Sequence, residues 1–255
     1  VYTCPLARTG SVQFAFRRMP LELISSWSAP HDRMTLGASD LHVWRAALNV
    51  EPATADRLGA LLSADERAHA RRFYFDRDRL HYAAARGVLR ALTGRYLGIA
   101  PAAVAFRYGS HGKPYVDAGL SFNLSHSHGL ALYAFARQGD IGIDVERINP
   151  EFNVEEIAAN FFTPGEVADI RAQPGGLRHE RFFDFWTRKE AYIKARAKGL
   201  SIPLNEFEVL DRDSIGAWSV YALDAGSGFA AALVSAVPPD SLYCFDWDGT
   251  YGLAL

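Results

Sequence analysis

The sequence predicts an α+β fold built from two similar halves. Each half begins with a strand of alternating apolar residues, continues through short helices into one long helix, and closes with further strands. Hydrophobic residues make up 49% of the 255 residues and charged residues 22%, which is ample for a packed core. We therefore divide the chain into an N-terminal extension over residues 1–39 with no clear periodicity, an N-terminal subdomain over 40–138 and a C-terminal subdomain over 139–255.

The first half opens with a strand and three helices. Residues 41–46 alternate as a strand, and residues 53–62 carry apolar residues at helical spacing. Ser63 and Glu66 have the spacing of a capping box, so a second helix should begin near residue 64. The longest helical pattern covers residues 77–97. After it we expect strands over 105–108, 120–124 and 130–136, with a turn over 109–114.

The second half repeats this plan. A strand over 141–145 precedes a short helix near 154–160, a helix capped at 163–166 and a long helix over 178–198. Strands are expected over 206–210, 217–223, 229–234 and 242–245.

Two fragments of the second half could together bind one hard metal ion. The two-residue period of residues 141–146 puts Asp144 and Glu146 on one face of a strand, and Glu190 and Lys194 lie one turn apart on a helix. Three carboxylates beside an ammonium group favour a Mg²⁺ and phosphate site, because Mg²⁺ takes oxygen ligands and shares them with phosphates. Taken singly, each fragment is more typical of a solvated strand or helix face. The metal hypothesis requires Glu190 to be buried toward Asp144 and Lys194 to contact an anion.

Two turns of the first half offer groups that bind anions. Residues 122–127 end a strand and bring Ser125, His126 and backbone N–H groups together, while residues 112–114 present Lys113 in a Gly-Lys-Pro turn. Such histidines and such turns are more often purely structural. Because these residues belong to the first half and all three acids to the second, a site containing both sets would lie in the cleft between the halves.

Composition excludes several other classes of function. The formal charge of −2 gives no general attraction to nucleic acid or to an anionic membrane. No apolar run approaches the roughly 20 residues that span a bilayer. Cys4 and Cys244 lack the spacing of a zinc site or a disulfide framework, so a reducing cytoplasm is the expected location.

The order and spacing of the motifs resemble those of the 4'-phosphopantetheinyl transferases of the surfactin-synthetase-activating type. The resemblance covers about residues 41–209 and is carried by the motifs at 71–73, 112–114, 122–127, 141–146, 161–163, 185–194 and 198–200. It implies an enzyme that moves the phosphopantetheine arm of coenzyme A to a serine hydroxyl of an acyl or peptidyl carrier protein, releasing 3',5'-ADP with the help of Mg²⁺. It also implies a monomer whose halves, related by a pseudo-twofold axis, imitate a dimer.

The resemblance assigns roles residue by residue. Asp144, Glu146 and Glu190 are the expected metal ligands. His69 stands where relatives often place Lys or Arg for the 3'-phosphate, so Arg72 or Arg86 should take more of that charge. The expected catalytic residues are Asp144, Glu190, His126 and Lys194. The expected coenzyme A-binding residues are His69, Arg72, Arg86, Lys113, Ser125, His126, Lys189 and Lys194.

The resemblance leaves three questions open. The serine proton could pass to Glu190 or to a metal-bound water. Residues 152–171 are the expected carrier surface, with Arg171, Arg178 and Arg181 as contacts for acidic carrier helices. The alternatives are a Mg²⁺-dependent phosphohydrolase that activates water, and a non-catalytic relative that only binds coenzyme A or a carrier.

Overall fold

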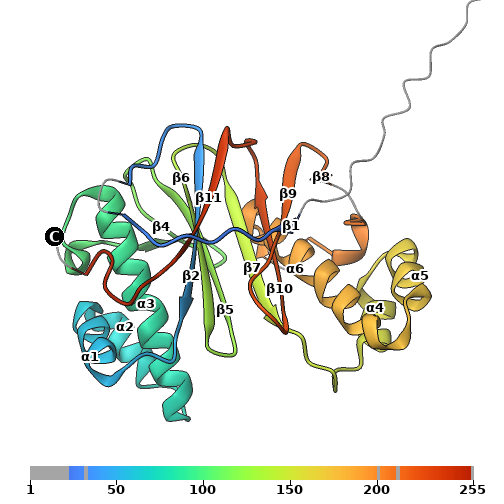
Figure 1. The fold of residues 1–255 in the computed structure, drawn as a ribbon, viewed down its shortest axis with the longest axis horizontal. Helices are drawn as coiled ribbons and strands as arrows, with labels where there is room; N and C mark the ends of the chain where they lie inside the picture. The colour runs from blue at the N-terminus through green and yellow to red at the C-terminus, as the bar shows by residue number, and fades with distance from the viewer. Residues whose placement is uncertain (1–22, 32–33, 200–201, 211–212, 254–255) are drawn as a thin grey trace, which may run out of the picture.

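Two β-sheets, each accompanied by three helices, lie side by side in the computed structural model (Figure 1). The structure describes residues 23–31, 34–199, 202–210 and 213–253. The first sheet has the strand order β11-β2-β6-β5, and the second has the order β1-β9-β10-β7 with β8 paired to β9. No helix within the described ranges is long and apolar enough to span a bilayer.

The first half contains most of the first sheet and the helices α1 to α3. Its strands are β2 (Asp40–Ala47), β5 (Ser121–Ser127) and β6 (Leu130–Ala136), with a two-stranded hairpin of β3 (Arg107–Tyr108) and β4 (Pro114–Tyr115). Its helices are α1 (Pro52–Leu61), α2 (Ala64–Ala70), α3 (Asp76–Leu97) and the short 3₁₀ turn η1 (Pro101–Ala103).

The second half contains the helices α4 to α6 and the second sheet. Its helical elements are α4 (Val154–Phe161), α5 (Pro164–Ala172), η2 (Gly175–Leu177), α6 (Arg178–Arg196) and η4 (Leu204–Glu206). Its strands are β7 (Ile141–Arg147), β8 (Ser214–Ile215), β9 (Trp218–Leu223) and β10 (Phe229–Ser235), with β1 (Leu23–Ile24) at the edge beside β9. The last strand of the chain is β11 (Ser241–Asp246).

The same pairing pattern occurs once in each half. β2 pairs antiparallel with β6, which pairs antiparallel with β5. In the second half β7 pairs antiparallel with β10, which pairs antiparallel with β9. Three helices separate the first and second strands of each set along the chain. This repeat confirms the prediction of two similar α+β halves.

Both predicted helix caps are capping boxes, and the glutamates of both are buried. Ser63 caps α2 with Glu66, and Thr163 caps α5 with Glu166. In each half the long helix supplies the counter-charge. Arg86 and Arg90 of α3 pair with Glu66, whereas a single lysine of α6 pairs with Glu166. The two boxes therefore fasten a short helix to the long helix of the same half.

The last strand does not belong to the half that the sequence predicts for it. β11 pairs in parallel with β2, from Ser241 opposite Asp40 to Asp246 opposite Arg45, and so completes the first sheet. In Figure 1 the red strand β11 lies beside the blue strand β2. The boundary 139–255 therefore needs correction: residues 241–246 return to the first half, where Phe245 is buried in its core.

The predicted strand over residues 206–210 is wrong. The segment contains the end of η4, and none of its described residues pairs as a strand. Its backbone groups are bound by buried side chains instead. The ammonium of Lys189 donates to the carbonyl oxygens of Leu204 and Phe207, and Val209 N–H donates to Glu166. These bonds occupy backbone groups of Phe207 and Val209 that a strand would pair in a ladder.

Three apolar clusters hold the molecule together. One lies between the first sheet and its helices, and a second lies between the second sheet and α4 to α6. The third joins the two sheets and includes Val43 of β2, Leu132 of β6, Ile143 of β7 and Leu233 of β10. Since strand residues alternate between faces, each sheet contributes one face to its own helices and the other to the shared cluster. The halves are therefore not independent domains.

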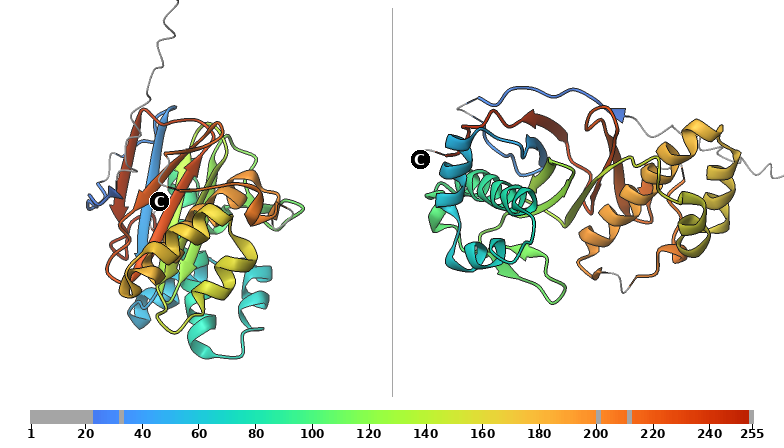
Figure 2. Two further views of the ribbon diagram at one scale, coloured as in Figure 1. Left: turned by 90° about the vertical axis from the view of Figure 1, so that its right-hand side faces the viewer. Right: turned by 90° about the horizontal axis from the view of Figure 1, so that it is seen from below.

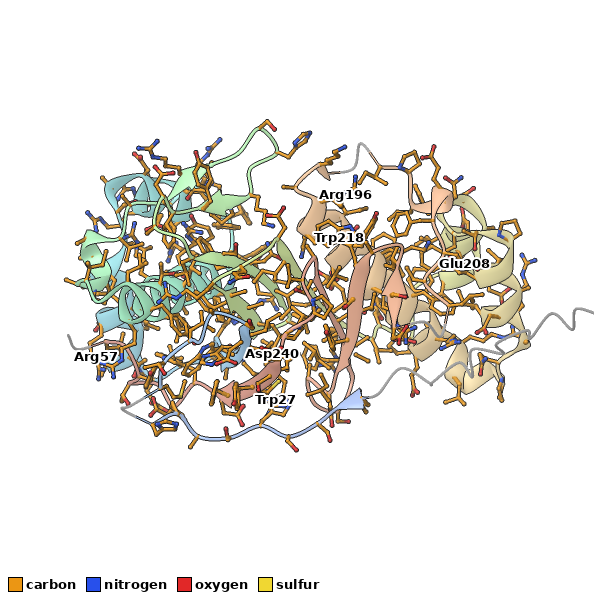
Figure 3. All side chains as sticks on the ribbon, turned by 90° about the horizontal axis from the view of Figure 1, so that it is seen from above. Trp27, Arg57, Arg196, Glu208, Trp218 and Asp240 are labelled. Atoms are coloured by element: carbon orange, nitrogen blue, oxygen red, sulfur yellow. The ribbon has the colours of Figure 1, made fainter. Side chains whose placement is uncertain are left out.

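The described part of the predicted N-terminal extension crosses both sheets, whereas residues 1–22 and 32–33 of it lie outside the described residues. β1 pairs in parallel with β9, and Ser28 forms a bridge to Phe245 of β11. The indole N–H of Trp27 donates to Asp224 O at 2.7 Å. Figure 3 shows Trp27 near the junction of the two halves, and Figure 2 shows the blue segment spanning them.

Candidate active site

Polar side chains line the junction where β5 of the first half meets β7 of the second. Asn123 Oδ1 accepts a hydrogen bond from Ile143 N at 2.8 Å. Two residues further along β5, Ser125 Oγ donates to Asp144 Oδ1, also at 2.8 Å. Two residues beyond that, Ser127 Oγ donates to Glu146 Oε2 at the same distance. The β5 side chains at this junction are all buried, so they fix the positions of both carboxylates.

Helix α6 brings the remaining groups to the same place. Trp186, Glu190 and Lys194 are spaced by four residues and therefore lie along one face of the helix. The helix packs against β7 at Gly142, where an added Cβ atom would overlap the backbone of Ala191 and Ala195. The missing side chain lets α6 approach β7 closely enough for its pocket-facing residues to reach the acids of the strand.

These elements enclose a pocket of about 450 Å³ between the halves. Its lining residues come from β5, β7 and α6, and they are Leu124, Ser125, His126, Asp144, Glu146, Trp186, Glu190 and Lys194. All five residues expected to be catalytic or to ligate metal are among them. The sequence signal for this arrangement was the alternation in β7 and the four-residue spacing in α6.

Asp144, Lys194 and Ser125 form a connected polar group at the pocket floor. The ammonium of Lys194 lies 2.6 Å from Asp144 Oδ1 and 3.0 Å from Ser125 Oγ. Asp144 is only 2% exposed, whereas its second oxygen, Oδ2, has no hydrogen-bond partner. Lys194 thus pairs with an expected metal ligand of its own half, Glu190 is only half-buried, and a buried carboxylate oxygen beside the pocket is left without a donor.

The pocket has an excess of negative charge. Burial raises the pKa of Glu146 and of Glu190, and the nearby charge of Asp144 raises both further. The Lys194 ammonium only partly offsets this effect. The arrangement is what a cation would relieve, because each carboxylate is less stable in its charged form while the others are charged.

The donor set fits a hard divalent cation, although the carboxylates are not gathered around one point. No group of three or more His, Cys, Asp or Glu side chains in the described part of the chain is close enough to hold a metal ion as it stands. The three acids of the pocket nevertheless provide carboxylate oxygens as ligands, and Asp144 Oδ2 has no hydrogen-bond partner. Oxygen donors of this kind are the ligands that Mg²⁺ and Ca²⁺ select.

His126 lies on the first-half side of the pocket mouth. Partial burial of its ring lowers the pKa of His126, and the Lys194 ammonium and His81 lower it further. A neutral imidazole near neutral pH can donate or accept one hydrogen bond at each nitrogen. The sequence analysis assigned no role in the site to Asn123 or Ser127. Their alternation with Ser125 along one strand indicates that the three side chains share a face.

Five expected coenzyme A-binding residues lie outside the pocket lining: His69, Arg72, Arg86, Lys113 and Lys189. His69 is exposed in the last turn of α2, and Arg72 is exposed just after the helix ends. The ring centroids of His69 and Tyr82 are 4.8 Å apart. Lys113 is half-buried, and its ammonium donates to the carbonyl oxygens of Ile141 and Lys194 at 2.8 and 2.9 Å.

Two of these residues, Arg86 and Lys189, are paired within the protein. Arg86 is 7% exposed and donates to Glu66 and to Tyr108 Oη, so its guanidinium is already bound. Lys189 is fully buried, with its ammonium 2.8 Å from Glu166. Burial lowers the pKa of Lys189, although Glu166 opposes that effect. Both cations stabilise their own half and are not available to a ligand in the pocket.

The fold and the pocket define a class of protein: two α+β halves that share an acidic, lysine-containing site suited to phosphate chemistry. Family comparisons agree with this class. Residues 140–236 match the model of the 4'-phosphopantetheinyl transferase superfamily, and residues 50–137 match the model of the 4'-phosphopantetheinyl transferase N-terminal region. The chain therefore belongs to the 4'-phosphopantetheinyl transferase superfamily, a family of transferase enzymes.

Individual relatives agree as well. The chain is 38% identical over 222 residues to the 4'-phosphopantetheinyl transferase HetI of Nostoc sp., covering 83% of this chain and 94% of the relative. It is 32% identical over 156 residues to the 4'-phosphopantetheinyl transferase Sfp of Bacillus subtilis strain 168, covering 60% and 68% of the two chains. The 4'-phosphopantetheinyl transferase gsp of Aneurinibacillus migulanus is 39% identical over 104 residues, or 41% and 43% of the two chains.

Proposed function

We propose that this chain transfers the 4'-phosphopantetheine arm of coenzyme A to a serine hydroxyl of an apo carrier protein and releases 3',5'-ADP. One observation carries the proposal. Asp144, Glu146, Glu190 and Lys194 converge on a single pocket between the halves of a chain that belongs to the phosphopantetheinyl transferases. Because both halves are in one chain, we expect the monomer to be the active unit.

The reaction makes one bond and breaks one. The serine oxygen attacks the phosphorus that carries the pantetheine arm, and the bond from that phosphorus to the bridging oxygen of the diphosphate breaks. Negative charge grows on the leaving 3',5'-ADP, so catalysis depends on positioning and on charge neutralisation. Lys194 supplies positive charge inside the pocket, and His126 supplies a hydrogen bond at its mouth.

Asp144, Glu146 and Glu190 are the residues that would hold Mg²⁺. When bound, the ion would neutralise charge on the diphosphate. Ser125 and Ser127 orient two of these carboxylates from the opposite half, so the first half prepares a site whose acids belong to the second. Glu190 lies on the pocket face of α6 and would accept the serine proton directly or through one water molecule.

The coenzyme A contacts divide into two groups. Ser125, His126 and Lys194 line the pocket and would meet the diphosphate. His69 and Arg72 are exposed beyond the pocket, which suits the distal 3'-phosphate better than the reacting phosphorus. At that position His69 would contribute less charge than a lysine near neutral pH, so Arg72 would carry more of it.

The carrier protein would dock on the surface formed by residues 152–171. Phe152 and Phe161 are 41% and 50% exposed there, which gives the surface an apolar character. Two of the arginines expected to attract an acidic carrier are already paired, Arg178 with Glu155 and Arg181 with Asp169, both at 2.6 Å. Docking is therefore expected to depend more on apolar contact than on charge.

The test is incubation with coenzyme A, Mg²⁺ and apo carrier proteins, followed by mass spectrometry of the carrier. We expect a mass increase of one phosphopantetheine group on a serine, with release of 3',5'-ADP. Hydrolysis of coenzyme A without carrier modification would instead indicate a phosphohydrolase. Binding without either product would indicate a non-catalytic relative.

Removing pocket carboxylates should abolish transfer. Asp144→Asn and Glu190→Gln keep the size of each side chain, so we expect both variants to fold and to lose at least about 100-fold in kcat, because charge neutralisation typically supplies that much. Mg²⁺ titration calorimetry should show weakened binding in both variants. Asp56→Asn, an exposed aspartate of α1, is the control. Near-normal transfer by both pocket variants would contradict the proposed metal site.

A further inference from the structure

A hairpin of the first half reaches across to the C-terminal end of α6. The hairpin of β3 and β4 is closed by a turn in which Gly109 N donates to Lys113 O at 3.0 Å. Its tip approaches the segment after α6, where a Cβ atom added to Gly199 would lie 3.1 Å from His111 Cδ2. Figure 2 (right) and Figure 3 show the hairpin extending on the same side of the molecule as the end of α6.

Lys113 makes the polar connection between the hairpin and the end of α6. Its ammonium donates to Ile141 O at 2.8 Å and to Lys194 O at 2.9 Å. Both acceptors belong to segments that carry pocket side chains. Lys194 is itself a pocket residue, and Ile141 begins the strand that carries Asp144 three residues later. One side chain of the first half thus holds two backbone segments of the second.

The end of α6 benefits from an external donor. Ala197 caps the helix with φ of 50°, in the left-handed region that favours glycine, and its N–H donates to Lys194 O at 3.2 Å. A non-glycine residue in this region costs free energy unless its surroundings hold it. A cation bound to the last carbonyls of a helix also interacts favourably with the helix dipole. Lys113 supplies such a cation at the turn that carries Lys194.

We propose that Lys113 is a positioning residue of the transfer reaction, which clamps the last turn of α6 to the start of β7 and so fixes Lys194 relative to Asp144. The proposal rests on the proposed function for its kinetic consequence and on the hydrogen bonds alone for the clamp. In this role the Lys113 ammonium acts by binding the backbone carbonyls of Ile141 and Lys194, in place of a direct contact with the nucleotide. A misplacement of about 1 Å in a catalytic group can cost about 100-fold in rate.

The two roles predict different kinetics. A cation that contacts coenzyme A contributes to its binding, so its removal raises KM for coenzyme A. A residue that fixes Lys194 contributes to the reacting geometry, so its removal lowers kcat with KM nearly unchanged. Lys113→Met removes the ammonium and keeps most of the aliphatic stem. Arg107→Met is the matched control, because Arg107 is an exposed cation of the same hairpin whose ion-pair partner is Asp117.

The kinetic experiment compares both variants with the parent chain in the mass-shift assay, with kcat corrected for the folded fraction from thermal unfolding. For Lys113→Met we expect kcat about 10-fold to 100-fold lower and KM for coenzyme A within about twofold. Arg107→Met should keep the parent kcat. A rise in KM for Lys113→Met without a fall in kcat, or no change in either constant, overturns the positioning role.

Hydrogen exchange tests the clamp without relying on catalysis. In Lys113→Met, amide exchange over residues 192–198 and 141–144 should accelerate about 10-fold or more relative to the rest of the chain, whereas Arg107→Met should leave it unchanged. Unaltered exchange in Lys113→Met overturns the clamp. If the parent chain transfers no phosphopantetheine but the local exchange still changes, the clamp stands and the proposed function fails. The two ideas can therefore fail separately.

Discussion

Neighbouring residues of α6 illustrate what a motif can and cannot predict. Successive residues of a helix point about 100° apart, so Lys189 cannot face the pocket that Glu190 faces. The structure buries Lys189 against Glu166 and the carbonyls of Leu204 and Phe207. The motif contains both residues and does not distinguish their roles. The helix geometry does, because it makes Lys189 a structural cation and Glu190 a pocket carboxylate.

We predict that Lys189→Met destabilises the fold without changing coenzyme A binding. The substitution leaves Glu166 buried without its cation, which should cost about 3–5 kcal/mol of unfolding free energy. Denaturant titration measures the loss. Below the unfolding transition, KM for coenzyme A should stay within about twofold of the parent value.

The double variant Lys189→Met with Glu166→Gln should recover part of the lost stability, because it removes the uncompensated charge and keeps an acceptor at residue 166. A rise in KM with no loss of stability would instead return Lys189 to the coenzyme A site.

At the scale of elements, the contact of β7 with α6 decides whether the pocket exists. Strand periodicity predicts that Asp144 and Glu146 share a face, and helical spacing predicts that Glu190 and Lys194 do. Neither pattern specifies how close the two elements come. Gly142 supplies that information, because its Cα packs directly on the α6 backbone at Ala191 and Ala195.

Gly142→Ala tests this contact. The added methyl group has no space and must push β7 away from α6, so we expect a loss of about 1–3 kcal/mol in unfolding free energy, typical of overpacking, and a lower kcat in the folded protein. Gly59→Ala is the control, because nothing lies within 4 Å of a Cβ at that position of α1. Helix propensity predicts that the control is stabilised by about 0.5–1 kcal/mol. Stability unaffected by Gly142→Ala would show that the two backbones can separate freely.

At the scale of the whole molecule, the two halves share structure that neither contains alone. β11 returns from the C-terminal end to pair with β2, and the third apolar cluster takes side chains from both sheets. The site depends on this union, since serines of β5 orient carboxylates of β7.

We predict that a fragment of residues 40–138 does not fold cooperatively. It lacks β11 and exposes Val43 and Leu132, which the second sheet covers in the whole chain. Thermal unfolding followed by near-ultraviolet circular dichroism should give no cooperative transition for the fragment and a single transition for the whole chain. A fragment with its own sharp transition would show that the first half is an autonomous domain.

The sequence by itself determined the local elements and the chemical inventory of this protein. Alternation and helical spacing depend on neighbouring residues, so they predicted the strands around Asp144 and His126, the long helix of Glu190 and both capping boxes. Tertiary structure alone decided three matters: that β11 joins the first sheet, that residues 206–210 bind buried side chains instead of a strand, and that Lys113, Arg86 and Lys189 bind protein groups. These outcomes depend on which distant partner satisfies each buried polar group, and local periodicity contains no information about distant partners.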